Sequence, residues 1–146
     1  MKIIAFILAV ASQSPAVAAT TDDRAVLQSE CGSCHVAYPA KMLPAAAWGQ
    51  VLGRLDRHYG VDASLDEASL AAVARQLHAP RVSGAQVTRT TALPRITTSA
   101  WFREEHDEVG ADAWRRPAVK GAANCDSCHQ DAARGDFEED NVRIPR

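Results

Sequence analysis

The sequence predicts an all-α fold with extensive loop, and three observations support this. Apolar residues recur at helical spacing over residues 45–59 and again over residues 64–78. The alternating patterns that are typical of β-strands are weak along the whole chain. Aromatic residues make up only 5% of the 146 residues, so we expect another large apolar group to help fill the core.

Two helices are predicted in the N-terminal part of the chain. The first begins at Thr21, which two aspartates follow, and continues to His35. The second covers residues 45–59, with Pro44 near its first turn and Gly60 as its stop. The apolar stripe of the second helix predicts that it packs against something large.

A third helix is predicted to begin at Ser64, because Ser64 and Glu67 form the S-x-x-E pattern of a capping box. The following residues, 79–97, are rich in Pro, Thr and Gly and are typical of a connection. We therefore predict two domains, which cover residues 20–85 and 86–146.

The first 19 residues (1–19) are predicted to be a secretory signal peptide. Lys2 precedes an apolar run over residues 3–11, and Ala16-Val17-Ala18 is a suitable cleavage site. A membrane anchor is the alternative, but this run has about half of the roughly 20 residues that a spanning helix needs. We therefore expect an exported, periplasmic protein without membrane insertion.

Charge says little about the partners of the protein. The chain has 16 basic and 18 acidic residues and no basic stripe, so we do not expect it to bind nucleic acid. We interpret the acidic residues 136–140 as a solvated end with Phe137 tucked in, and a docking patch is the alternative. We expect a monomer.

All four cysteines belong to two copies of one motif, C-x-x-C-H, which is the signature of c-type haem attachment. Each thiol adds to one vinyl group of the porphyrin, and the His that follows is carried under the ring to bind iron. We therefore predict two covalently attached haem c groups. Their thioethers involve Cys31, Cys34, Cys125 and Cys128, and their proximal iron ligands are His35 and His129.

Three other arrangements are compatible with four cysteines. They are two disulfides, a Cys₄ zinc site, and thioredoxin-like redox pairs. None of them requires a His directly after each pair, and the long separation of the two pairs further disfavours zinc. The fold prediction therefore becomes a small helical c-type cytochrome with two haem-bearing halves.

The sixth ligand of each iron decides between a closed electron-transfer centre and a centre that binds other molecules. The chain has five histidines, so three remain for two positions. His58 lies at the edge of the apolar stripe of the second predicted helix. His78 lies near the end of the third helix, where a cation interacts favourably with the helix dipole, so we interpret it as structural. Met42 lies too close to its own haem edge to reach the far face, and we interpret it as core packing.

His106 lies in the middle of the apolar stripe of a short fourth helix. Thr98 or Ser99 caps this helix, which is predicted to run to Glu108. We therefore predict His58 and His106 as the two distal ligands, with His58 on the first haem and His106 on the second.

Several spaced groups of residues occur in a characteristic order. They are the first motif, Pro44, Trp48, His58-Tyr59-Gly60-Val61-Asp62, Ile96-Thr97, Trp101-Phe102-Arg103-Glu104-Glu105-His106, Asn124 with the second motif, and Gly135-Asp136-Phe137-Glu138. This order resembles the bacterial periplasmic dihaem cytochrome c family over nearly the whole mature chain. The chain departs from the family pattern at Tyr59, where Phe is expected, and at the paired Glu104-Glu105.

The resemblance implies an electron carrier with two low-spin haems, each with two His ligands. It implies His58 and His106 as the distal pair, and an N-terminal half similar to small monohaem cytochromes. It also implies redox partner proteins, among them a small oxygen-binding haem protein and a membrane b-type cytochrome.

Two histidines on each iron leave no open position for a substrate, and His in place of Met lowers the haem potential. We therefore expect a low-potential electron-transfer protein and not an enzyme. The main alternative is a haem enzyme or gas-binding haem protein in which one axial site is open or displaceable. A structural or haem-delivery module is a third possibility.

Overall fold

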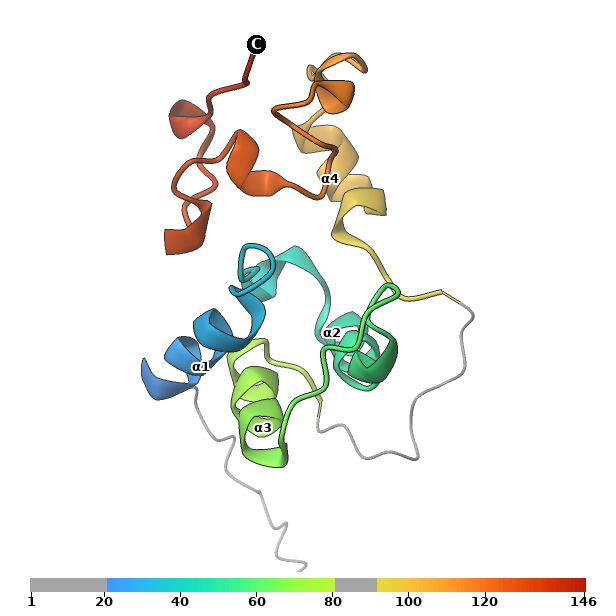
Figure 1. The fold of residues 1–146 in the computed structure, drawn as a ribbon, viewed down its shortest axis with the longest axis vertical. Coiled ribbons are helices and arrows are strands. Elements are labelled where there is room, and N and C mark those ends of the chain that lie inside the picture. The colour runs from blue at the N-terminus through green and yellow to red at the C-terminus, as the bar shows by residue number, and fades with distance from the viewer. Residues whose placement is uncertain (1–20, 81–91) are drawn as a thin grey trace, which may run out of the picture.

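The computed structural model describes residues 21–80 and 92–146, which form helices joined by loops (Figure 1). Within these residues the α-helices are α1 (Thr21–Cys31), α2 (Ala45–Leu52), α3 (Glu67–Gln76) and α4 (Ala100–Glu105). The described segments contain no β-strand, only the isolated bridges His58–Val61 and His129–Val142. The prediction of an all-α fold with extensive loop is confirmed.

Short 3₁₀ helices supply much of the remaining regular structure. In the described part of the chain they are η1 (Ala40–Met42), η2 (Leu55–Arg57), η3 (Ile96–Thr98), η4 (Ala113–Arg115), η5 (Cys125–Ser127), η6 (Ala132–Arg134) and η7 (Glu139–Asn141). The predicted signal peptide and the predicted boundary between residues 85 and 86 lie outside the described residues. Among the residues that are described, no helix has the length and apolar character needed to cross a membrane.

The two halves of the chain differ in how they are filled. Residues 21–80 form the lower body in Figure 1, and their hydrophobic cluster consists of Leu27, Ala37, Met42, Trp48, Leu52, Val73, Ala74 and Leu77. Residues 92–146 form the upper body, where the buried hydrophobic residues are Phe102, Ala113, Val119 and Ala132. Four such side chains make a thin core for a segment of this length, so the upper body needs a further apolar group.

An ion pair joins the two longest helices. Asp23 on α1 is 2% exposed, and Arg75 on α3 donates to both of its carboxylate oxygens, at 3.0 and 2.6 Å. A bidentate arginine satisfies a buried carboxylate in one fixed geometry. The pair therefore sets how α1 and α3 pack beneath the first attachment motif.

Hydrogen bonds also run between the two halves. Arg24 on α1 donates to the carbonyl of Arg134 at 3.2 Å, and Gln28 donates to the carbonyl of Ala133 at 3.0 Å. Phe137 packs against the hydrophobic cluster of the lower body. This packing agrees with the expectation that the Phe137 side chain packs against the protein.

Two of the predicted helices end earlier than expected. The helix from Thr21 stops at Cys31 rather than His35, because Gly32 is a weak helix former and the Ser33 hydroxyl donates to the carbonyl of Glu30 at 3.1 Å. The helix over residues 45–59 stops at Leu52, with Gly53 as its C-cap. His58 therefore follows η2 in extended backbone, and the prediction that it lies on a helix is wrong.

The cap of α3 also differs from the prediction. The N-cap is Asp66, whose carboxylate accepts hydrogen bonds from the backbone N–H groups of Ala68 and Ser69. Ser64 instead donates to Asp62 from both its backbone and its hydroxyl. An Asx turn therefore takes the place of the predicted S-x-x-E capping box.

The last α-helix begins as predicted and ends early. Ser99 is the N-cap of α4, and its hydroxyl accepts from the N–H of Phe102 at 3.0 Å. The helix stops at Glu105 rather than Glu108. The reason is that the His106 side chain, through Nδ1, bonds the Phe102 carbonyl that a continuing helix would use.

His78 closes α3 from an unusual backbone conformation. It has φ of 53°, its N–H donates to the carbonyl of Arg75, and the N–H of Ala79 donates to the carbonyl of Ala74. These two bonds are the Schellman motif, in which Gly is the preferred residue at the left-handed position. The exposed His78 therefore lies at a backbone position that disfavours a side chain.

Replacing His78 with glycine should stabilise the protein. His78→Gly removes left-handed strain worth about 1–2 kcal/mol, and the greater freedom of glycine in the unfolded chain offsets part of it. We expect the free energy of unfolding to rise by about 0.5–1 kcal/mol, measured by circular dichroism in guanidinium chloride. The control His78→Ala keeps the strain and should change little, and an equal gain in both variants would contradict this account.

Candidate haem-binding sites

The two attachment motifs adopt similar local turns. Cys31 ends α1, and Cys125 begins η5. The central serine of each motif bonds back to the carbonyl three residues earlier, Ser33 to Glu30 at 3.1 Å and Ser127 to Asn124 at 2.7 Å. Each turn brings its two cysteines and the following histidine onto a short stretch of backbone.

The C-terminal residues hold the second motif in place. The N–H of Arg143 donates to the carbonyl of Cys128 at 2.9 Å, next to the bridge between His129 and Val142. Arg116 reaches the carbonyl of Pro145 at 2.8 Å. The last residues of the chain therefore pair with the motif and fix the direction of His129.

The four thiols are free in the structure. No disulfide joins them, and burial, followed by the nearby Glu30, raises the pKa of Cys31 to about 11. Burial also raises the pKa of Cys125. Residues 21–80 and 92–146 contain no group of three or more His, Cys, Asp or Glu side chains that could hold a metal ion.

Each motif histidine faces one of the other histidines. The ring centres of His35 and His58 are 6.2 Å apart, and those of His106 and His129 are 6.1 Å apart. Imidazole nitrogen binds a metal at about 2.0 Å, and each ring centre lies about 1.1 Å farther away, so two imidazoles on one iron have centres roughly 6 Å apart. Both pairs therefore fit a porphyrin iron between their rings.

Hydrogen bonds select the nitrogen that can bind iron. Nδ1 of His35 lies 2.7 Å from the carbonyl of Val36, and Nδ1 of His106 lies 2.8 Å from the carbonyl of Phe102. A carbonyl only accepts, so each Nδ1 carries the proton and Nε2 keeps a free lone pair. Such second partners orient the histidine ligands of metal sites.

Burial keeps the facing histidines neutral. It lowers the pKa of His58, and the neighbouring His35 lowers it further. The pKa of His129 is lowered by burial and then by His106. Because a metal binds the neutral imidazole, both shifts favour ligation.

One buried atom has no partner among the described residues, Nδ1 of His58. A buried polar group without a hydrogen bond costs about 1–3 kcal/mol. Within the described chain, His58 therefore lacks the partner at Nδ1 that a carbonyl gives His35 and His106.

Aromatic side chains surround the second histidine pair. Phe102 stacks on His106, with ring centres 4.1 Å apart and planes at 18°. Trp114 lies 5.8 Å from His106 and 6.1 Å from Phe102. Trp114 was not predicted as part of a site. It lies in a connection between helices, where no helical pattern of apolar residues indicates which side chains face a site.

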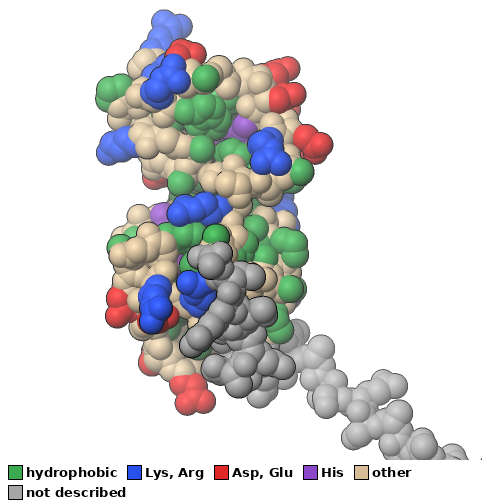
Figure 2. Space-filling model, turned by 90° about the vertical axis from the view of Figure 1, so that its right-hand side faces the viewer, with side chains coloured by type: hydrophobic (Ala, Val, Ile, Leu, Met, Phe, Trp, Pro, Cys, Tyr) green, Lys and Arg blue, Asp and Glu red, His purple; other side chains and the backbone are tan. Residues whose placement is uncertain are grey.

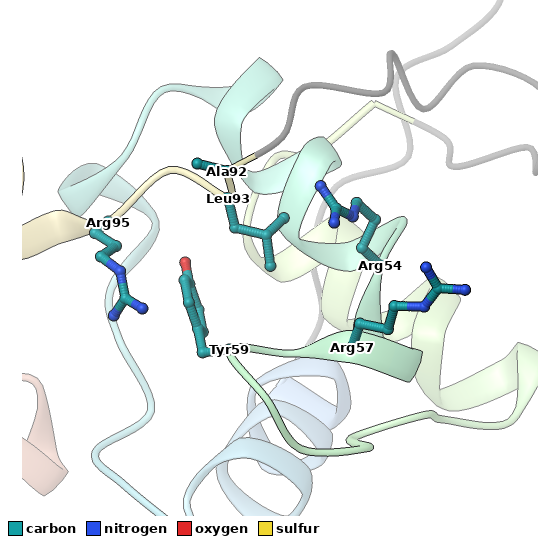
Figure 3. Close-up of a pocket in the computed structure, with 6 residues that line it drawn as sticks. All are labelled: Arg54, Arg57, Tyr59, Ala92, Leu93 and Arg95. Carbon is teal, nitrogen blue, oxygen red and sulfur yellow. The ribbon is translucent and has the colours of Figure 1, made fainter.

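An open pocket of about 230 Å³ lies beside the first pair (Figure 3). Tyr59 forms one wall, and its ring contacts His58 edge to face with centres 4.8 Å apart. The Arg95 guanidinium lies over the Tyr59 ring at 4.4 Å, and Arg54 and Arg57 lie on the other side of the pocket. The surface next to His58 is therefore aromatic and rich in arginine.

The remaining candidates lie apart from these pairs. His78 is exposed at the end of α3, and Met42 is buried in the hydrophobic cluster of the lower body. Figure 2 shows histidine atoms at the surface among hydrophobic atoms in both bodies. The structure thus brings together His35 with His58 and His106 with His129, which is the pairing proposed from the sequence.

Comparisons with known proteins agree with this geometry. The sequence profile described as dihaem cytochrome c matches residues 27–137. The solved diheme cytochrome c of Shewanella baltica OS155 is 36% identical, with a TM-score of 0.70 over 84% of this chain and 94% of that chain. A crystal structure from Rhodobacter sphaeroides, also 36% identical, has a TM-score of 0.62 over 82% of this chain and 99% of that one. Comparison with the curated proteins gives no match.

The two haems should differ in their electron paramagnetic resonance spectra. The planes of His35 and His58 lie at 23°, whereas those of His106 and His129 lie at 69°. When the two imidazole planes are nearly parallel, the two iron d orbitals of π symmetry differ clearly in energy. When the planes are nearly perpendicular, these orbitals are close in energy. We expect the oxidised protein to give one rhombic signal and one signal of larger g anisotropy.

The variant His106→Ala assigns these signals. It should remove the more anisotropic signal and leave the rhombic one. A single type of signal that accounts for both haems would contradict the difference in ring angles.

Proposed function

Because the chain belongs to the dihaem cytochrome c family, we propose that it carries electrons in the periplasm through two haems, each held by two histidines. His35 and His58 would ligate the first iron, and His129 and His106 the second. Cys31 and Cys34, and Cys125 and Cys128, would form the thioethers. The observation that carries this proposal is the spacing of 6.2 and 6.1 Å between the facing imidazole rings.

A closed pair of ligands favours electron transfer over catalysis. When bound, each haem supplies an iron that takes up and releases one electron, at a potential that histidine ligands keep low. The chain contributes four imidazoles, two of them with a carbonyl partner at Nδ1. Neither iron would then keep a free position for a substrate.

The rival function is a haem enzyme or gas-binding protein with one displaceable histidine. One observation favours it at the first site, because Nδ1 of His58 has no hydrogen-bond partner among the described residues. His106, by contrast, bonds the carbonyl of Phe102. If one axial bond is weaker than the others, we therefore expect it to be that of His58.

The partners are proposed to be redox proteins, including the small oxygen-binding haem protein and the membrane b-type cytochrome that the resemblance implies. The surface around Tyr59 is a candidate docking site, since its ring contacts His58 and Arg57 and Arg95 lie beside it (Figure 3). Tyr and Arg are enriched at protein interfaces. Such a surface suits a partner with acidic groups around its own redox centre.

Carbon monoxide tests whether the irons are closed. The reduced wild-type protein should show no shift of the Soret band with stoichiometric gas, because each iron holds two imidazoles. His58→Ala and His106→Ala should each open one different haem and give a shift of about half the full size.

The control for this experiment is His78→Ala, which removes an exposed histidine and should behave as the wild type. A clear shift in the wild-type protein would refute closed ligation for that haem. A shift in His78→Ala alone would refute the assignment of the distal ligands.

The arginines beside Tyr59 should control the exchange of electrons with charged reagents. In Arg57→Glu/Arg95→Glu, oxidation of the reduced protein by ferricyanide, an anion, should become slower. Oxidation by hexaammineruthenium(III), a cation, should become faster, because the local potential changes sign. Stopped-flow absorbance at low ionic strength measures both rates.

The control is Arg146→Glu, at the C-terminus of the upper body (Figure 1). It changes the net charge by −2 without changing the pocket, whereas the double variant changes it by −4, so the logarithm of each rate should change by much less than half as much. An effect half as large as that of the double variant would mean that total charge, and not this surface, sets the rates.

A further inference from the structure

Tyr38 belongs to the lower body and reaches the second attachment motif. Its ring stacks on His35, with centres 4.9 Å apart and planes at 18°. Its hydroxyl donates to the carbonyl of Ala123 at 3.3 Å, two residues before Cys125. One side chain therefore connects the proximal ligand of the first site with the thioether position of the second.

Phe137 makes the corresponding contact in the opposite direction. Its ring lies 5.4 Å from His129, and it packs against the hydrophobic cluster of the lower body. Each proximal histidine thus has an aromatic neighbour that extends into the other half. These contacts form the seam, which we define by Tyr38, Ala123, Cys125 and Phe137.

We propose that Tyr38 is the positioning residue that couples the two haem sites, and that electrons cross between the halves along the seam. This inference rests on the proposed electron-transfer function. The exchange moves one electron, since one iron goes from Fe(II) to Fe(III) as the other goes from Fe(III) to Fe(II). Tyr38 gains or loses no electron or proton in this exchange. It acts by fixing the His35 ring and the segment before Cys125.

The two functional groups of Tyr38 have separable roles. The ring fixes the plane of His35, which sets the spectrum of the first haem. The hydroxyl donates to the backbone just before the second motif, and this bond sets the distance between the two haem sites. Other bonds across the halves, such as Gln28 to Ala133, do not involve Tyr38 and hold the bodies together without it.

Nuclear magnetic resonance of half-reduced protein tests the proposal. The haem methyl signals report how fast an electron moves between the two irons within one molecule. Tyr38→Phe keeps the ring and removes the hydroxyl, so we expect slower exchange and an unchanged rhombic signal in electron paramagnetic resonance. Tyr38→Leu removes both groups, so we expect still slower exchange together with a shifted rhombic signal.

Gln28→Ala is the matched control, since the Gln28 side chain also donates a hydrogen bond across the halves, from Nε2 to the carbonyl of Ala133. Like Tyr38→Phe, it removes one bond between the bodies, but it leaves the bond from Tyr38 to Ala123 in place. We expect this variant to exchange electrons internally as fast as the wild type. Equal slowing in Gln28→Ala and Tyr38→Phe would overturn the proposal.

Two further measurements keep the result interpretable. Haem absorbance shows that each variant carries both groups, and dithionite titration shows that both can be reduced. If both haems load and reduce but Tyr38→Leu exchanges at the wild-type rate, the seam is not the route, although the electron-transfer function stands. If carbon monoxide binds the wild-type protein, the proposed function itself fails.

Discussion

In the proposed ligation, the span of two imidazoles across one iron is the constraint on which the rest of the structure depends. Each motif must bring its histidine to roughly 6 Å from a partner that is far away in the sequence, and the described chain does this twice. Around the first pair, η2 and a turn at His58 provide the partner, and around the second it is the end of α4. Hydrogen bonds and aromatic rings then fix the plane of each ring.

The same constraint explains why the two bodies are filled so differently. The lower body has a hydrophobic cluster of its own, organised by Trp48 and by the packing of α1 on α3. The upper body has few buried apolar side chains, and Phe102, Trp114 and Phe137 lie around the histidine pair. Its fold is therefore centred on the prosthetic group.

Much of the site could be predicted from the sequence, because C-x-x-C-H places its chemistry within five consecutive residues. The prediction for His58 rested on an incorrect helix, since Gly53 ends α2, and the structure nevertheless places the ring of His58 6.2 Å from that of His35. The end of α4 depends on a side-chain bond from His106 that no periodic pattern contains. Tyr38, Trp114 and Phe137 acquire their roles from contacts across long stretches of chain, which one sequence does not reveal.

The contacts between the halves have an energetic consequence. The side-chain hydrogen bonds that join the two bodies in the described chain, from Arg24, Gln28, Tyr38 and Tyr59, are exposed and contribute about 1 kcal/mol each. Burial of a phenylalanine adds up to about 3 kcal/mol. Exposed hydrogen bonds and few buried contacts are typical of regions that open at low free energy, which places the separation of the halves among the earliest openings of the native protein.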